Sequence, residues 1–204
     1  MSFPPRIAIA TRNEHKLIEI GRICADWPVS WLTIHDLHRP WPDVEETGAT
    51  YLENALLKAR AVAVAFDEPA MADDSGIEAD ALGGKPGIHS ARWVAGEDAT
   101  DGGNLNALIQ VMAGVPKSGR SARYRCVAAI AWPDGREVHA EGMCEGMLTR
   151  KPRGAGGFGY DPVFVPAGWD QTMAELSDNE KDRISHRGRA FRALRDLVGI
   201  PDSR

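Results

Sequence analysis

A short apolar segment that leads directly into two aspartates is the feature that most constrains the fold of this chain. Residues 69–72 read Pro-Ala-Met-Ala, and Asp73 and Asp74 follow them. An apolar run of this length, preceded by charged residues, is typical of a buried strand. Ligands of open α/β sheets bind beyond the carboxyl ends of the strands. The pattern therefore predicts a strand whose carboxyl end carries both acids into a crevice.

The composition is that of one globular domain. The chain has 204 residues, of which 43% are hydrophobic and 26% charged, enough apolar material for one substantial core. We therefore expect a single domain over residues 1–204. The three cysteines, Cys24, Cys126 and Cys144, are widely spaced and form no CxxC pair, which excludes a cysteine zinc site and suits a reducing compartment. They are expected to be core thiols.

Charge and hydropathy limit the partners that are expected. The formal net charge of -5 argues against broad binding to a nucleic-acid backbone, although it is compatible with a small anionic ligand in a local basic pocket. The first six residues lack the apolar region of a signal peptide, and the apolar run at residues 61–66 is too short to span a bilayer. We expect a cytoplasmic protein with neither a nucleic-acid nor a membrane partner.

Strands and helices are expected to alternate in the first half of the chain. Strands are predicted at residues 6–11, 29–34, 69–72 and 77–81, and helices at residues 16–26, about 51–66 and 103–113. A hairpin is predicted later, with residues 123–132 and 137–147 paired around the Pro-Asp-Gly at residues 133–135. After a capping box from Ser177 to Glu180, a last helix is expected to bury the apolar residues Ala190, Phe191, Leu194, Leu197 and Val198.

The loop at residues 11–16 could serve either of two purposes. It lies between a predicted strand and a predicted helix, where free backbone N–H groups and the helix dipole favour phosphate oxygens, and Lys16 would add a full charge. The GxxxxGK[ST] pattern of a P-loop is absent from the chain. Taken alone, the segment is more often a simple helix-capping turn.

Adjacent aspartates indicate a cation. Two neighbouring carboxylates repel each other unless a cation or strong donors offset their charges, and Mg²⁺ takes one or two carboxylates plus substrate phosphates. Glu45 or Glu46 could supply a second ligand, although such a pair is usually a solvated charge run. Asp73 and Asp74 could instead cap a turn. Lys58 lies one helical turn after Asn54, so both side chains could point along one helix edge toward a ligand.

The C-terminal part contains a glycine loop, residues 154–161, with the sequence Gly-Ala-Gly-Gly-Phe-Gly-Tyr-Asp. Phe158 and Tyr160 could stack on a base, or could be core aromatics beside a turn. A basic cluster follows, and it could bind nucleic acid, cover a solvated surface or collect around a polyphosphate. It comprises Lys181, Arg183, His186, Arg187 and Arg189.

Together these segments resemble the inosine triphosphate pyrophosphatase family, whose members hydrolyse nonstandard purine nucleoside triphosphates. The resemblance runs nearly end to end and rests on at least seven motifs in the right order, which is far more specific than any one of them. They lie at residues 11–16, 45–48, 51–55, 72–76, 82–87, 90–92, 157–162 and 185–188. One position departs from the family pattern: Arg12 stands where the family usually has glycine. If that position needs a positive φ, the arginine would carry strain; if not, it would add charge near phosphate.

The resemblance implies a role for each site residue. Asp74 would be the general base and a Mg²⁺ ligand, with Glu45 or Glu46 supporting the metal. The triphosphate would be held by Thr11, Asn13, Lys16 and Lys58. The other substrate-binding residues would be Arg12, Glu14, His15, Ser75, Arg92, Phe158, Gly159, Tyr160, Asp161, Lys181, His186 and Arg187.

The resemblance also implies a fold and an activity. The fold would be α/β, a twisted mixed β-sheet flanked by helices, with two lobes around a central substrate cleft. The protein would hydrolyse ITP, dITP and XTP to the monophosphate and pyrophosphate with Mg²⁺, as a homodimer. Two alternatives remain open: a related pyrophosphatase that prefers pyrimidine or modified nucleotides, and a nucleotide sensor or scaffold without catalysis.

Overall fold

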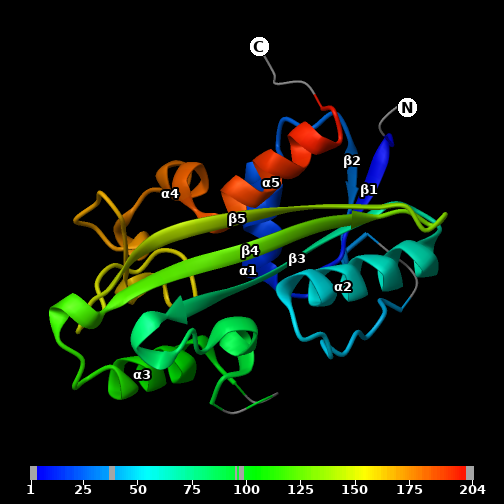
Figure 1. Ribbon diagram of the computed structural model, residues 1–204. Coiled ribbons are helices and arrows are strands. Elements are labelled where there is room, and N and C mark those ends of the chain that lie inside the picture. Colours follow the sequence, from blue (N-terminus) through cyan, green and yellow to red (C-terminus); the bar gives the residue numbers. More distant parts are fainter. Residues whose placement is uncertain (1–3, 37–39, 95, 97–98, 201–204) are drawn as a thin grey trace. The chain divides into compact units, whose positions relative to one another are not determined.

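The computed structural model describes residues 4–36, 40–94, 96 and 99–200. Within these residues the strands form one mixed sheet in the order β2-β1-β3-β4-β5-β6 (Figure 1). The strands are β1 (Arg6–Ile9), β2 (Ser30–Leu32), β3 (Ala70–Ala79), β4 (Ser121–Ala131), β5 (Glu137–Leu148) and β6 (Phe164–Pro166). The helices are α1 (Glu14–Ile23), α2 (Tyr51–Phe66), α3 (Asp101–Val111), α4 (Asp178–Ile184) and α5 (His186–Leu197). The predicted α/β class is confirmed.

The chain divides into two compact units. Unit 1 comprises residues 1–74, 126–142 and 187–204, and unit 2 comprises residues 75–125 and 143–186. The strands β3, β4 and β5 each contribute residues to both units. The boundary in β3 falls between Asp74 and Ser75, so the two predicted acids belong to unit 1.

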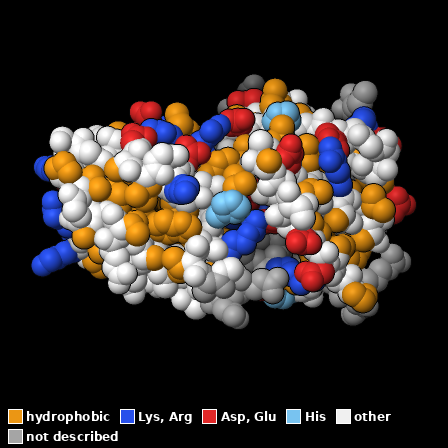
Figure 2. All heavy atoms as spheres, turned by 60° about the horizontal axis from the view of Figure 1, so that its bottom comes forward, with side chains coloured by type: hydrophobic (Ala, Val, Ile, Leu, Met, Phe, Trp, Pro, Cys, Tyr) orange, Lys and Arg blue, Asp and Glu red, His pale blue; other side chains and the backbone are white. Residues whose placement is uncertain are grey.

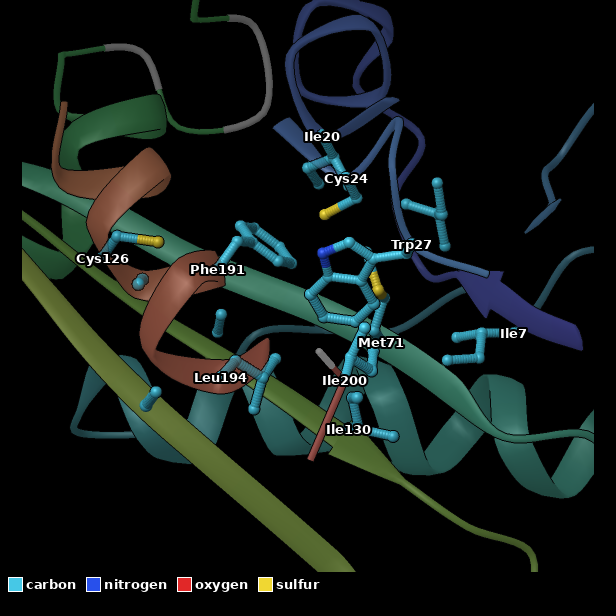
Figure 3. Close-up of a cluster of buried hydrophobic side chains, with 14 residues drawn as sticks. Ile7, Ile20, Cys24, Trp27, Met71, Cys126, Ile130, Phe191, Leu194 and Ile200 are labelled. Atoms are coloured by element: carbon cyan, nitrogen blue, oxygen red, sulfur yellow. The ribbon is translucent and has the colours of Figure 1, made fainter. Parts of the chain in front are cut away.

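The core of unit 1 has a layer of side chains on each face of its strands. Successive residues of a strand point to opposite faces. Ile7 and Ile9 therefore pack with α1 and α5, whose Ile20, Phe191 and Leu194 meet Met71 and Trp27 in one buried cluster (Figure 3). The alternate residues on β1 and β3 are alanines, and they pack against Ala59, Val62 and Ala63 of α2. Because alanine is small, α2 can approach this face of the strands closely.

The core of unit 2 gathers around the other half of the long strands. Ile77 of β3, Tyr124 of β4 and Leu148 of β5 pack with Leu108 of α3 and with Phe164 of β6. The Tyr124 and Phe164 rings meet edge to face, with centroids 4.8 Å apart. This cluster also reaches the glycine loop through Tyr160.

One strand prediction was wrong. The segments expected as two strands, residues 69–72 and 77–81, are one continuous strand, β3, so Asp73 and Asp74 lie within it and not at its end. The strand register nonetheless places the two acids beside a loop. Parallel pairing with β1 ends at Ile9 opposite Met71, and β1 gives way to the loop at residue 10. Asp73 and Asp74 thus lie just beyond the carboxyl end of their neighbouring strand.

Several local predictions were confirmed. Ser177 and Glu180 form the expected capping box before α4, and the hairpin of β4 and β5 is present. Cys24, Cys126 and Cys144 are buried, as expected of core thiols, and none of them forms a disulfide. The last helix buries Ala190, Phe191 and Leu194 as expected, but Leu197 is 61% exposed because it lies at the helix end, beyond the cluster that covers Leu194.

The described surface carries charges of both signs. On the face drawn in Figure 2, basic and acidic side chains are interspersed with hydrophobic ones. None of the helices in the described residues is long and apolar enough to cross a membrane.

Candidate active site

Strand alternation sends the two adjacent aspartates of β3 to opposite faces. Met71 and Asp73 share the face packed by α1 and α5, whereas Ala72 and Asp74 share the face packed by α2. Both carboxylates are buried, with exposed fractions of 2% for Asp73 and 4% for Asp74. Each acid therefore meets a different set of partners.

Asp73 is neutralised by cations from both helices on its face. Its Oδ2 accepts hydrogen bonds from the Arg187 guanidinium at 3.1 and 3.3 Å and lies 3.3 Å from Lys16 Nζ. Arg187 also pairs with Glu19 of α1. The Cys126 thiol lies 3.7 Å from the same carboxylate oxygen. In the part of the chain that the structure describes, Asp73 Oδ1 has no hydrogen-bond partner.

Asp74 receives a donor on each carboxylate oxygen, and both donors come from α2. Lys58 Nζ lies 3.2 Å from Oδ1, and Asn54 Nδ2 donates to Oδ2 at 3.3 Å. Lys58 also lies 2.5 Å from Glu46 Oε1, so one ammonium joins the two carboxylates. Asn54 Oδ1 accepts from Gly48 N at 2.8 Å, which anchors the loop that carries Glu46. Since Asn54 and Lys58 are four residues apart, they share one edge of α2, as the sequence predicted.

The surroundings push the pKa values of the two aspartates in opposite directions. Burial raises the pKa of Asp74 above its ordinary value, and the opposing charges of Lys58 and Lys16 do not cancel this effect. Burial alone would also raise the pKa of Asp73, but Arg187, Lys16 and Lys58 together outweigh it and hold that pKa well below its usual range. Asp73 is thus a fixed negative charge, while Asp74 is the acid better suited to exchange a proton.

The loop at residues 11–16, predicted to bind phosphate or to cap a helix, caps α1 and places Lys16 beside Asp73. Asn13 Oδ1 accepts from Lys16 N at 3.1 Å and caps α1, and Thr11 Oγ1 accepts from Asn13 N at 3.1 Å. Lys16 Nζ lies 3.4 Å from the carbonyl oxygen of Asp73. The capping interpretation is therefore correct, and it places Lys16 beside the acids.

The other residues of that loop point to the surface. Arg12 donates to Asp43 Oδ1 at 3.0 Å and to the Trp41 carbonyl at 2.9 Å. Asp67 is the one non-glycine residue with positive φ in the described ranges, so Arg12 carries no such strain. Glu14 pairs with His35 at 3.0 Å, and His15 is exposed on the first turn of α1. The printed partners of Arg12 and Glu14 are thus residues other than Asp73 and Asp74.

The glutamates at residues 45 and 46 differ in environment. Glu46 is partly buried against Lys58, as described above. Glu45 is exposed, and within the described residues its side chain makes no hydrogen bond or ion pair. The structure thus brings Glu46, and not Glu45, to Asp74.

In unit 2 the glycine loop is built around the buried carboxylate of Asp161. Its Oδ2 accepts from Lys181 Nζ at 2.6 Å and from Phe158 N at 3.0 Å, and its Oδ1 accepts from Tyr124 OH at 3.1 Å. The Lys181 ammonium also lies over the Phe158 ring, 5.2 Å from its centroid. Gly157 has φ +66°, and a Cβ there would collide with Asp161 Oδ2, so this position requires glycine.

The remaining predicted residues of unit 2 lie on neighbouring segments. Tyr160 is only 4% exposed and donates its hydroxyl to the Ser90 carbonyl at 2.8 Å, so its ring is a core aromatic and offers little face to a base. His186 is buried and stacks on Tyr124, with ring centroids 4.5 Å apart. Ser75 follows Asp74 on β3, and Arg92 ends the 3-10 turn η2 (Gly87–Arg92).

The basic cluster predicted around the last helix is not one patch. Lys181 pairs with Asp161 in unit 2 and Arg187 pairs with Asp73 in unit 1, while Arg183 and Arg189 are exposed. Sequence reasoning missed two buried polar partners, Glu19 and Tyr124. A signal was present for Glu19, because it precedes Ile20 near the apolar stripe of α1, where an uncompensated acid is costly.

A divalent cation fits the donor set beside Asp74. No group of three or more His, Cys, Asp or Glu side chains in the described residues could hold a metal ion by itself. Magnesium, however, usually binds through one or two carboxylates and completes its shell with water and substrate phosphates. Asp74 and Glu46 provide two such carboxylates around a single ammonium.

The fold and the site together indicate what kind of protein this is. The protein is an α/β protein in which carboxylates and lysines meet beyond the end of a parallel strand, a combination suited to an anionic ligand. The Ham1 family model matches residues 7–197, and the chain belongs to the Ham1 family.

Relatives match nearly the whole chain. A dITP/XTP pyrophosphatase of Streptomyces coelicolor is 49% identical over 199 residues, covering 95% of this chain and 99% of its own length. One of Geobacillus kaustophilus is 46% identical over 188 residues, covering 92% and 91%. The Ham1 protein of Staphylococcus aureus has a TM-score of 0.81 at 39% identity, covering 95% of this chain and 97% of its own.

Because their surroundings differ, the two aspartates should differ in how much stability the protein loses when each is replaced by asparagine. Asp73→Asn removes one of the two carboxylates, Asp73 and Glu19, that balance the cations Arg187 and Lys16. One positive charge is then left unbalanced in the interior, so the free energy of unfolding at pH 7 should fall by about 3 kcal/mol or more. Asp74→Asn removes a charge whose burial is unfavourable. This variant should change the free energy of unfolding by about 1 kcal/mol or less. Urea denaturation in metal-free buffer measures both. Equal losses in the two variants would contradict the division of roles.

Proposed function

We propose that this protein hydrolyses noncanonical purine nucleoside triphosphates, namely dITP, XTP and ITP, to the monophosphate and pyrophosphate. Membership of the Ham1 family and the close dITP/XTP pyrophosphatase relatives support the activity. In this chain the proposal depends on the pair of buried acids on β3, with Lys16 beside Asp73 and Lys58 beside Asp74. Such an enzyme removes these nucleotides from the pool before they enter DNA or RNA.

In the proposed reaction, Asp74 accepts a proton from a water that attacks the α-phosphorus. The bond from that phosphorus to the bridging oxygen breaks, and pyrophosphate leaves. Lys58 and Asn54 hold both oxygens of Asp74, which fixes the direction of the remaining lone pairs. Lys16 and Lys58 offset negative charge on the triphosphate, and Asp73 holds the Lys16 ammonium in place.

We propose Mg²⁺ as the metal, with Asp74 and Glu46 as its protein ligands. When bound, the ion supplies charge neutralisation on phosphate oxygens. Glu46 is positioned for this by the Gly48–Asn54 hydrogen bond and by Lys58. Thr11 and Asn13 are proposed to direct the first loop toward the phosphates.

Recognition of the base is proposed for residues of unit 2. Phe158 offers a ring face, and the Lys181 ammonium offers a donor to the 6-oxo group of hypoxanthine or xanthine. Adenine would present an amino donor at the same place, leaving two donors opposed. Other residues proposed to contact or enclose the substrate are Ser75, Arg92, Gly159, Asp161, His186 and Arg187. Tyr160 is proposed to stabilise the glycine loop through the hydrogen bond from its hydroxyl to the Ser90 carbonyl.

Three further properties accompany the proposal. The chain acts as one bilobed catalytic domain over residues 1–204. It forms a homodimer, as the family resemblance implies. It works in the cytoplasm, a reducing compartment that suits three cysteines without a disulfide.

The proposal predicts a specific substrate profile. With Mg²⁺, pyrophosphate should be released rapidly from dITP, XTP and ITP, and slowly from ATP, dTTP and GTP. Guanine shares the 6-oxo group, so slow release from GTP requires a further penalty on its 2-amino group. Asp74→Asn should lower kcat by at least about 100-fold while nucleotide binding is largely kept, because the base is lost but the lysines remain. Separate assays for pyrophosphate and phosphate measure this. Preference for dTTP would indicate the pyrimidine enzyme, and binding without turnover would indicate a sensor.

The two neighbouring glutamates provide a matched test of the metal site. Glu46→Gln removes a charge that faces Asp74, so the Mg²⁺ concentration for half-maximal rate should rise about tenfold. Glu45→Gln removes an exposed charge and should leave that concentration within about twofold. Rates measured across a Mg²⁺ titration decide between them. A larger effect of Glu45→Gln would overturn the assignment.

A further inference from the structure

The first turn of α3 contacts two separate segments of unit 2. One is the glycine loop, and the other is the stretch at residues 90–94 that contains Arg92. Both segments carry side chains that the proposed function places on the nucleotide. Neither contact involves the acids of β3.

Asp101 reaches the glycine loop directly. Its Oδ2 accepts a hydrogen bond from Gly159 N at 3.0 Å, and Gly159 has the left-handed φ of +61°. The carboxylate is not needed to cap its own helix, because the Thr100 hydroxyl already accepts from Gly103 N at 3.1 Å. Asp101 therefore fixes the backbone of the residue that directly follows Phe158.

Asn104, one turn further along α3, is directed toward the other segment. Its side chain is 2% exposed, and both ends of the amide are used. Nδ2 donates to the Ala91 carbonyl at 2.9 Å, and Oδ1 accepts from Val94 N at 3.3 Å. The two bonded residues flank Arg92, so Asn104 fixes the backbone on both sides of it.

A third hydrogen bond links the glycine loop directly to the segment at residues 90–94. Tyr160, which follows Gly159, donates to the carbonyl of Ser90, which precedes Ala91. The Ser90 hydroxyl in turn accepts from Ile77 N of β3 at 2.9 Å. Each of the three parts, the glycine loop, the Arg92 segment and α3, is thus hydrogen-bonded to the other two. The Arg92 segment is also hydrogen-bonded to β3.

We propose that Asp101 and Asn104 are positioning residues for nucleotide recognition, which hold Phe158 and Arg92 in the arrangement that the base requires. The proposal rests on the proposed function. A loop ordered before binding loses less conformational entropy when the ligand arrives. Loss of either anchor should therefore weaken binding of the nucleoside part and leave the triphosphate contacts of unit 1 unaffected.

The test compares four variants of the full chain: Asp101→Ala, Asp101→Asn, Asn104→Ala and Asn106→Ala. Asp101→Asn keeps an acceptor for Gly159 N, and Asn106 is an exposed control on the same helix. Three quantities are measured: kcat and KM for dITP, inhibition by inorganic tripolyphosphate, and hydrogen exchange of the loop amides. Tripolyphosphate lacks a nucleoside, so it reports on the phosphate contacts alone.

Asp101→Ala should raise KM for dITP roughly three- to tenfold, the effect of one hydrogen bond, with kcat within about twofold. Tripolyphosphate inhibition should not change, exchange at Gly159 should accelerate, and Asp101→Asn should restore most of the binding. Asn104→Ala should act in the same direction, whereas Asn106→Ala should match the wild type.

Unchanged KM in Asp101→Ala, or an equal loss of tripolyphosphate inhibition, would overturn the proposal. If the wild type released no pyrophosphate from dITP, the proposed function would fail, and unchanged exchange at Gly159 would separately refute the role of Asp101 in holding the loop.

Discussion

Two consecutive carboxylates in the interior of a strand must be balanced separately, because alternation sends them to opposite faces of the sheet. The rest of unit 1 follows from that constraint. Arg187 from α5 and Lys16 from α1 balance Asp73 on one face, and Lys58 from α2 serves Asp74 on the other. The same alternation sorts the apolar residues of β1 and β3 into isoleucine and methionine on one face and alanine on the other. Charge balance and packing therefore use the same helices.

Much of the fold could be predicted from local patterns. The capped helix that begins at residue 51, the Ser177 capping box and the hairpin around residues 133–135 each depend on residues close together in the sequence. The placement of Asn54 and Lys58 on one helix edge also followed from periodicity. What failed was the continuity of β3, because polar residues in the middle of a strand resemble a break until their buried partners are known.

The partners of the site residues could not be predicted in the same way. Arg187 lies 114 positions from Asp73 in sequence, and a run of basic residues gives no indication that its members divide between distant carboxylates. The choice between Glu45 and Glu46 likewise depended on the path of a loop that only tertiary contacts with α2 define. The role of Asp101 depends on a contact with the glycine loop, 58 residues away.

In the proposed reaction, Asp74 of β3, held by Lys58 of α2, directs water to the α-phosphorus of a purine nucleoside triphosphate. The most direct measurement is hydrolysis of dITP in ¹⁸O-labelled water, with mass spectrometry of both products. If water attacks the α-phosphorus, the label enters the monophosphate and the pyrophosphate stays unlabelled. Label in pyrophosphate or in free phosphate would place the attack on another phosphorus and exclude this role for Asp74.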